Sequence, residues 1–166
     1  MLFRSASASP SGDEQRRNAQ SLVIEPEERL FMLQLAGAVG KSPRRLKRFV
    51  NSYRILKASL DNLQQETFVV KKGGSGEYRA AMVLLAIMTA APRSSLGIVE
   101  FLANSKDDSP LSQLEAHVQK LSDPSETSYV QAALLAYKTV QSNPPLATLR
   151  TWAPEVARFS FRSGRI

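Results

Sequence analysis

YRAAMVLLAIMTAA, residues 78–91, is the most apolar stretch of the sequence. Its apolar residues point in nearly all directions around a helix, which is the pattern of a helix buried on every side. Pro92 follows directly and predicts the end of that helix. The stretch is shorter than the roughly 18 residues that a membrane span requires. We therefore predict a central core helix and no membrane segment.

Helical spacing continues on both sides of this central stretch. Residues 26–39 begin with Pro26, Glu27 and Glu28, an acidic start that the helix dipole favours, and Gly40 predicts the helix end. Ser42 and Pro43 suit the cap and the first position of a second helix, residues 43–58. Apolar residues recur at helical spacing over four later stretches, residues 95–104, 110–121, 128–141 and 146–161. Residues 61–76 are interpreted as a loop with a short β-like piece at 68–70.

No stretch of the chain alternates convincingly between apolar and polar residues, so no sheet is expected. The sequence predicts an all-α fold, a compact bundle of about seven helices. We expect residues 22–162 to form a single helical domain, because 166 residues suit one hydrophobic core. Residues 1–21 are rich in Ser, Ala and charge and are predicted to be a flexible, disordered tail. Residues 163–166 are predicted to be a C-terminal tail.

Positive charge is concentrated in one part of the sequence. The formal net charge is +7, and the window from Arg29 to Leu60 holds eight basic residues and no acid. A localised basic patch indicates an anionic partner, with a solvated face as the alternative. The chain has no cysteine and no apolar segment at its N-terminus, so we expect a reducing compartment, the cytoplasm.

The predicted helix 43–58 has two different faces. At 100° per residue, one arc carries the expected core residues, Leu46, Phe49, Val50, Tyr53, Leu56 and Leu60. The opposite side carries a second stripe, Arg44, Arg48, Asn51 and Ile55. Cations at the helix start face the positive end of the helix dipole, which disfavours them by a few tenths of a kcal/mol each. A negatively charged partner near this end, or full hydration, would resolve that conflict.

Candidate catalytic groups are almost absent. The one histidine, His117, has no second histidine or cysteine to complete a zinc or copper site, so no metal site is predicted. Trp152 lies among apolar residues and is expected in the core. The Gly-rich residues 71–76 lack the spacing of a phosphate-binding loop. We expect no enzymatic activity from this chain alone.

The start of the basic helix carries a recognisable pattern, Gly40-x-x-Pro43-Arg44-x-x-Lys47-Arg48-Phe49-x-Asn51. It resembles the helical region that follows the nucleotide-binding core of KAP-type P-loop NTPases. Residues 27–39 and 152–161 are also similar to that region, and the resemblance extends over about residues 22–162. It implies a helical lid or regulatory C-terminal domain.

The resemblance also implies roles for individual residues. Arg44 would be a sensor arginine that approaches the γ-phosphate, with Arg48 as second choice. Contacts with the NTPase core in cis, or with a protein partner, would come from four further residues, Arg45, Lys47, Asn51 and Ile55. ATP and Mg²⁺ would be the cofactors of a full-length NTPase. They are not expected to bind this chain alone, because the sequence has no Gly-x-x-x-x-Gly-Lys-Ser/Thr loop.

Two other functions use the same helix 43–58 in a stand-alone module. Seven cations from Lys41 to Lys57 would support salt-dependent binding to nucleic-acid phosphates. Alternatively, the stripe with Ile55 would contact another protein. The residues alone leave these alternatives open.

Overall fold

The computed structural model describes residues 23–69, 76–106, 108–140, 144 and 146–160. These residues form eight helices and no β-strand, which confirms the all-α prediction. The helices are α2 (Pro26–Val39), α3 (Pro43–Ser59), α4 (Asn62–Phe68), α5 (Tyr78–Ala90), α6 (Ser95–Asn104), α7 (Leu111–Val118), α8 (Pro124–Val140) and α9 (Leu146–Ser160). The predicted tails, residues 1–21 and 163–166, lie outside the described residues.

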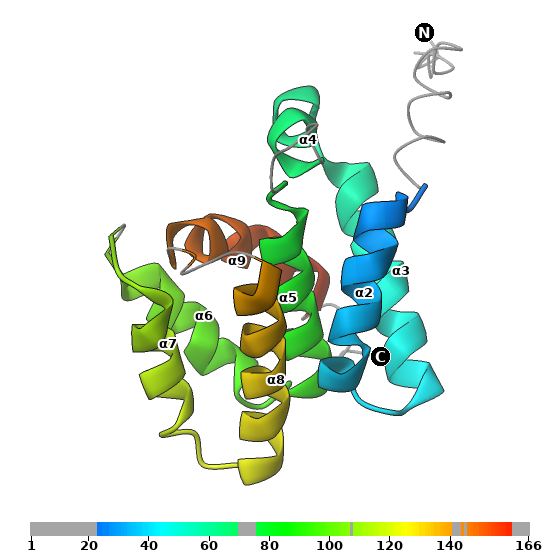
Figure 1. The fold of residues 1–166 in the computed structure, drawn as a ribbon. Coiled ribbons are helices and arrows are strands. Elements are labelled where there is room, and N and C mark those ends of the chain that lie inside the picture. Colours follow the sequence, from blue (N-terminus) through cyan, green and yellow to red (C-terminus); the bar gives the residue numbers. More distant parts are fainter. Residues whose placement is uncertain (1–22, 70–75, 107, 141–143, 145, 161–166) are drawn as a thin grey trace, which may run out of the picture.

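Helix α5 is the centre of the fold, as its composition predicted. Every residue of α5 except Arg79 is buried. Figure 1 shows α2, α8 and α9 arranged around α5, and α3 also packs on it. A helix surrounded by four others has no side left for solvent, so it needs apolar residues all round.

Helices α2 and α3 begin where the sequence predicted, and α3 ends one residue later than expected, at Ser59. Gly40 follows α2 with φ 96°, a left-handed backbone conformation that favours glycine, and the chain then turns into α3 at Pro43. Both helices contact α5, and they share fewer contacts with each other than either shares with α5. The short connection therefore holds the basic helix beside α2, on the outside of the core.

The prediction of a loop over residues 61–76 was wrong in its first half, where α4 forms. Asp61 accepts a hydrogen bond from the Gln64 backbone N–H at 2.8 Å, and the Gln64 side chain accepts one from the Asp61 N–H at 3.1 Å. This reciprocal capping box starts the helix. Phe68 is predicted as β-like but ends α4, fully buried, with its ring 4.9 Å from that of Trp152. Residues 70–75 lie outside the described residues.

Helix α8 starts earlier than the expected residue 128. Pro124 is its first residue, where a missing N–H costs nothing, so the predicted break is the helix start. The Asp123 carboxylate accepts hydrogen bonds from the Ser125 N–H at 2.9 Å and hydroxyl at 2.7 Å. The hydrogen bond from the Ser125 side chain is the main cause that lowers the pKa of Asp123. An acidic cap at the helix N-terminus thus fixes where α8 begins.

Candidate functional site

The two faces of α3 are placed as the helical spacing predicted. Phe49, Tyr53 and Leu56 are buried in the core, and Leu46 and Val50 pack half-buried beside them. On the opposite side, the predicted stripe is exposed along its whole length: Arg44, Arg48, Asn51 and Ile55. Ile55 is 55% exposed, an apolar side chain between charged ones.

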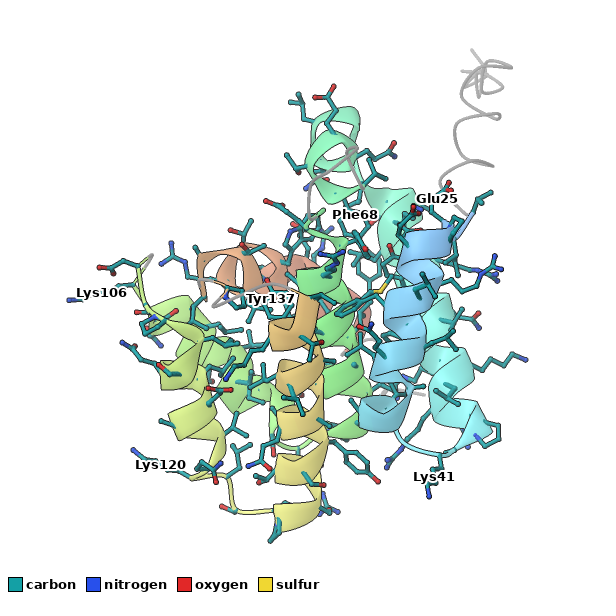
Figure 2. The ribbon with its side chains drawn as sticks, in the orientation of Figure 1. Glu25, Lys41, Phe68, Lys106, Lys120 and Tyr137 are labelled. Atoms are coloured by element: carbon teal, nitrogen blue, oxygen red, sulfur yellow. The ribbon has the colours of Figure 1, made fainter. Side chains whose placement is uncertain are left out.

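The first turn of α3 contains no acidic residue and no side-chain cap. Ser42 is the N-cap residue, as predicted, but its side chain makes no capping hydrogen bond, and the first turn contains no acid. Arg44 and Lys47 are exposed in this turn and the next. Lys41 projects from the connection between α2 and α3 (Figure 2). Free backbone N–H groups, the helix dipole and these cations together make this end attractive to an anion.

Arg45 has a partner inside the chain. Its guanidinium lies over the ring of Tyr129 in α8, 5.7 Å from the ring centroid, and the side chain is half-buried. A cation at this distance is attracted by the ring quadrupole. This contact ties the start of α3 to α8. The structure thus gives Arg45 an anchoring position, in contrast to the exposed Arg44 next to it.

Lys57, counted above among the seven cations, is buried in an ion pair. Its Nζ lies 2.7 Å from the Glu28 carboxylate and donates a second hydrogen bond to the Val23 carbonyl at 2.8 Å. Tyr53 donates its hydroxyl to the other Glu28 oxygen at 2.6 Å, and the Glu25 N–H donates to the carboxylate at 2.7 Å. Burial, and the negative charge of Glu28 beside it, raise the pKa of the Tyr53 hydroxyl above its usual range. This cluster joins α2 to α3.

The sequence pattern did not predict this cluster. Glu28 was interpreted only as a favourable acid at a helix start, and it also serves in the capping box of α2. One signal was available for Lys57. It follows Tyr53 by four residues and therefore falls on the core side of the helical wheel, next to Leu56. A cation on a core face requires a buried acid as its partner.

The remaining candidates occupy structural positions. Trp152 is buried, as predicted, and its indole N–H donates to the Glu77 carboxylate at 2.9 Å. His117 is half-buried and stacks on Phe101, with the ring centroids 4.5 Å apart. The described part of the chain has no group of three or more His, Cys, Asp or Glu side chains placed to hold a metal ion.

Gly40-Lys41-Ser42 has the last three residues of a phosphate-binding loop but not its setting. It connects two helices, and Leu35 stands where such a loop requires its first glycine. Over the described ranges, no helix is long and apolar enough to cross a bilayer.

In the described residues the fold is all-α, and the start of α3 carries exposed cations. The chain matches no protein-family model, no curated protein and no solved structure. The resemblance of residues 22–162 to the KAP-type region therefore stays a prediction from the sequence.

Proposed function

We propose that this domain is the helical lid, or regulatory C-terminal domain, of a KAP-like P-loop NTPase. In this role Arg44 contacts a nucleotide phosphate that is held by a separate nucleotide-binding core. The observation that carries the proposal is the start of α3, where exposed cations meet free backbone N–H groups and the first turn holds no acid. The Pro43-Arg44-x-x-Lys47-Arg48-Phe49 pattern stands at this same place.

The packing of α3 supports a sensing role. Its buried face is part of the core, Arg45 anchors its start on Tyr129, and the Glu28–Lys57 pair anchors its end. Because α3 is held at both ends, Arg44 would move with the whole domain. A phosphate that attracts Arg44 would then favour one position of the domain over another, and hydrolysis would release it.

ATP and Mg²⁺ would be held by the core of such a protein. The residues of this chain supply the arginine and the surface around it, and Asn51 and Ile55 on the same exposed stripe would contact the core or another partner. Arginine suits this task because its planar guanidinium binds two phosphate oxygens at once.

The test is ATP turnover of the full-length protein with Arg44→Ala, with Lys120→Ala as the matched control. Lys120 is exposed in the connection that follows α7, away from α3 (Figure 2). We expect Arg44→Ala to lower kcat by about tenfold or more, because an arginine on the transferred phosphate group strongly accelerates such reactions. The control should keep normal turnover, and circular dichroism should show that both variants fold. Unchanged turnover in Arg44→Ala would refute the sensor role.

Nucleic-acid binding is a second candidate, favoured by the exposed cations Lys41, Arg44, Lys47, Arg48 and Arg54 around α3. The contacts of Arg45 and Lys57 inside the fold weaken it, because they engage two of the seven predicted cations. This function requires an affinity for DNA or RNA that falls steeply between about 50 and 200 mM salt. An affinity that does not change with salt would exclude it.

A further inference from the structure

An apolar groove runs between α2 and α3 on the outside of the molecule. Its volume is about 700 Å³, and its apolar lining includes Met32, Leu33 and Ala36 of α2 and Leu46 and Val50 of α3. The groove exists because both helices pack on α5 more than on each other. We call it the α2–α3 groove.

The buried ion pair shapes one end of this groove. Lys57 donates a hydrogen bond to the Val23 carbonyl and so holds the segment before α2 against α3. Val23 and Ile24 of that segment also line the groove. The walls of the groove are thus parts of the fold held by buried contacts.

Large apolar side chains lie open to solvent here. Leu33 is 66% exposed and Val23 is 52% exposed, although both line the groove. Contiguous exposed apolar surface in a concave site is typical of a binding surface. The size of the groove is also in the range of well-formed binding sites, about 300–1,000 Å³.

The charged residues that line the groove are both arginines. Arg29 of α2 and Arg54 of α3 belong to the lining, which contains no acidic residue. Both arginines lie in the window of residues 29–60, which is free of acids. A partner for this groove therefore needs apolar side chains for its floor and carboxylates for the two arginines.

We propose that the α2–α3 groove binds an acidic amphipathic helix of a partner protein. The lining residues of α2 span 29–36, about 12 Å of helix, so the partner segment has about two to three turns. Apolar residues at i, i+3 or i+4, and i+7 of that segment lie on Leu33, Ala36, Leu46 and Val50, and its Asp and Glu residues pair with Arg29 and Arg54. This contact is separate from the phosphate contact of Arg44.

Charge also argues against two other occupants. Residues 1–22 of the chain contain three arginines, Arg4, Arg16 and Arg17, against the two acids Asp13 and Glu14. A second copy of the chain would bring another basic groove region to the first. Positive charge would meet positive charge in both cases, which lowers affinity.

The experiment is a display selection of random 16-residue peptides on the full chain, followed by fluorescence anisotropy with the selected peptides. We expect selected peptides with an apolar ridge of helical spacing and an excess of Asp and Glu. Leu33→Asp should weaken their binding at least tenfold. The matched control is Leu135→Asp on α8, where Leu135 is 63% exposed and lies outside the groove lining, and it should bind normally.

Two further comparisons test the charge contacts and the site. Arg29→Glu and Arg54→Glu should each weaken binding at least fivefold, whereas Lys120→Glu should not. Arg44→Ala should also bind the peptides normally, which separates this surface from the proposed phosphate contact.

Four results would overturn the proposal. The first two are that no helical acidic peptides are enriched, or that Leu33→Asp binds them as well as the unchanged chain. A synthetic peptide of residues 1–22 that displaces the selected peptides would assign the groove to the chain itself. Self-association of the full chain that Leu33→Asp abolishes would assign it to a second copy.

Discussion

Two buried tyrosines have opposite hydrogen-bonding situations. Tyr53 donates its hydroxyl to Glu28 at 2.6 Å, and both side chains are buried. Tyr137 is also buried, but its hydroxyl has no hydrogen-bond partner among the described residues. A hydrogen bond to a charged group stabilises a fold by about 1.5–3 kcal/mol, whereas an unpaired buried hydroxyl is a cost. Replacement of tyrosine by phenylalanine should therefore change the free energy of unfolding differently at the two positions.

We predict that Tyr53→Phe lowers the free energy of unfolding by about 1.5–3 kcal/mol, because one Glu28 oxygen loses its donor. Tyr137→Phe is expected to be neutral or slightly stabilising. Urea denaturation of the two variants and the unchanged chain provides the measurement. Equal losses in both variants would contradict the hydrogen-bond assignment.

Tyr137 also gives a prediction at high pH. Burial raises the pKa of Tyr137 to about 12, above the value of about 10 in an unfolded chain. The folded state therefore holds this proton more tightly than the unfolded state. Between pH 10 and about 12 the unfolded state loses the proton first, so the free energy of unfolding of the unchanged chain falls as the pH rises. The difference in unfolding free energy between Tyr137→Phe and the unchanged chain should grow in favour of the variant over that range. A difference independent of pH would contradict the shift.

At the scale of helices, the sequence predicted the elements that depend on local patterns. Gly40 and Pro43 mark the boundary between α2 and α3 because a left-handed glycine and an N-terminal proline act locally. Apolar spacing likewise predicted the buried and exposed sides of α3. Helix α4 was missed because seven residues give too little periodicity, and the packing of Phe68 on Trp152 joins residues far apart in sequence.

For the candidate site, the sequence likewise predicted which side chains of α3 are exposed but not their contacts with other helices. The exposure of Arg44, Arg48, Asn51 and Ile55 follows from the helical wheel of α3. The contacts of Arg45 with Tyr129 and of Lys57 with Glu28 do not, since each pairs two helices whose relative position depends on the whole core. The α2–α3 groove was unpredictable for the same reason.

Helix α6 depends on a carboxylate from another helix. Glu126 of α8 is buried and accepts hydrogen bonds from the Ser94 N–H at 2.8 Å and the Ser94 hydroxyl at 2.7 Å. It also accepts one from the Arg93 N–H at 3.3 Å. These donors lie at the N-terminus of α6, where backbone N–H groups have no partner within the helix. The charge of Glu126 also interacts favourably with the helix dipole.

We predict that Glu126→Ala lowers the free energy of unfolding by about 1–3 kcal/mol, because the part-buried donors of Arg93 and Ser94 lose their charged acceptor. Hydrogen exchange should become faster at the start of α6. The control is Glu115→Ala, which removes an exposed ion pair with Lys138 at 2.9 Å and should cost at most about 1 kcal/mol. Equal effects of the two variants would show that Glu126 does not cap α6.

At the scale of the whole molecule, α5 couples the helices that carry the proposed sites to the rest of the core. It contacts α2 and α3, which precede it in the sequence, and α8 and α9, which follow it. The extent of the domain, residues 22–162, stays a prediction, and cooperative unfolding is its direct test. A shared central helix favours one transition, because α2, α3, α8 and α9 all lose buried contacts when α5 unfolds.

Trp152 makes this test possible because it is the one tryptophan of the chain. Its ring packs on Phe68 of α4, and it donates to Glu77 just before α5, so its fluorescence reports on contacts among three helices. We predict that urea denaturation followed by Trp152 fluorescence and by far-ultraviolet circular dichroism gives the same midpoint. Leu85→Ala, at a fully buried position of α5, should shift both midpoints together, with a loss of about 2–5 kcal/mol. Separate midpoints would mean that part of the helical content unfolds independently of the region around Trp152, and the chain would then hold more than one folding unit.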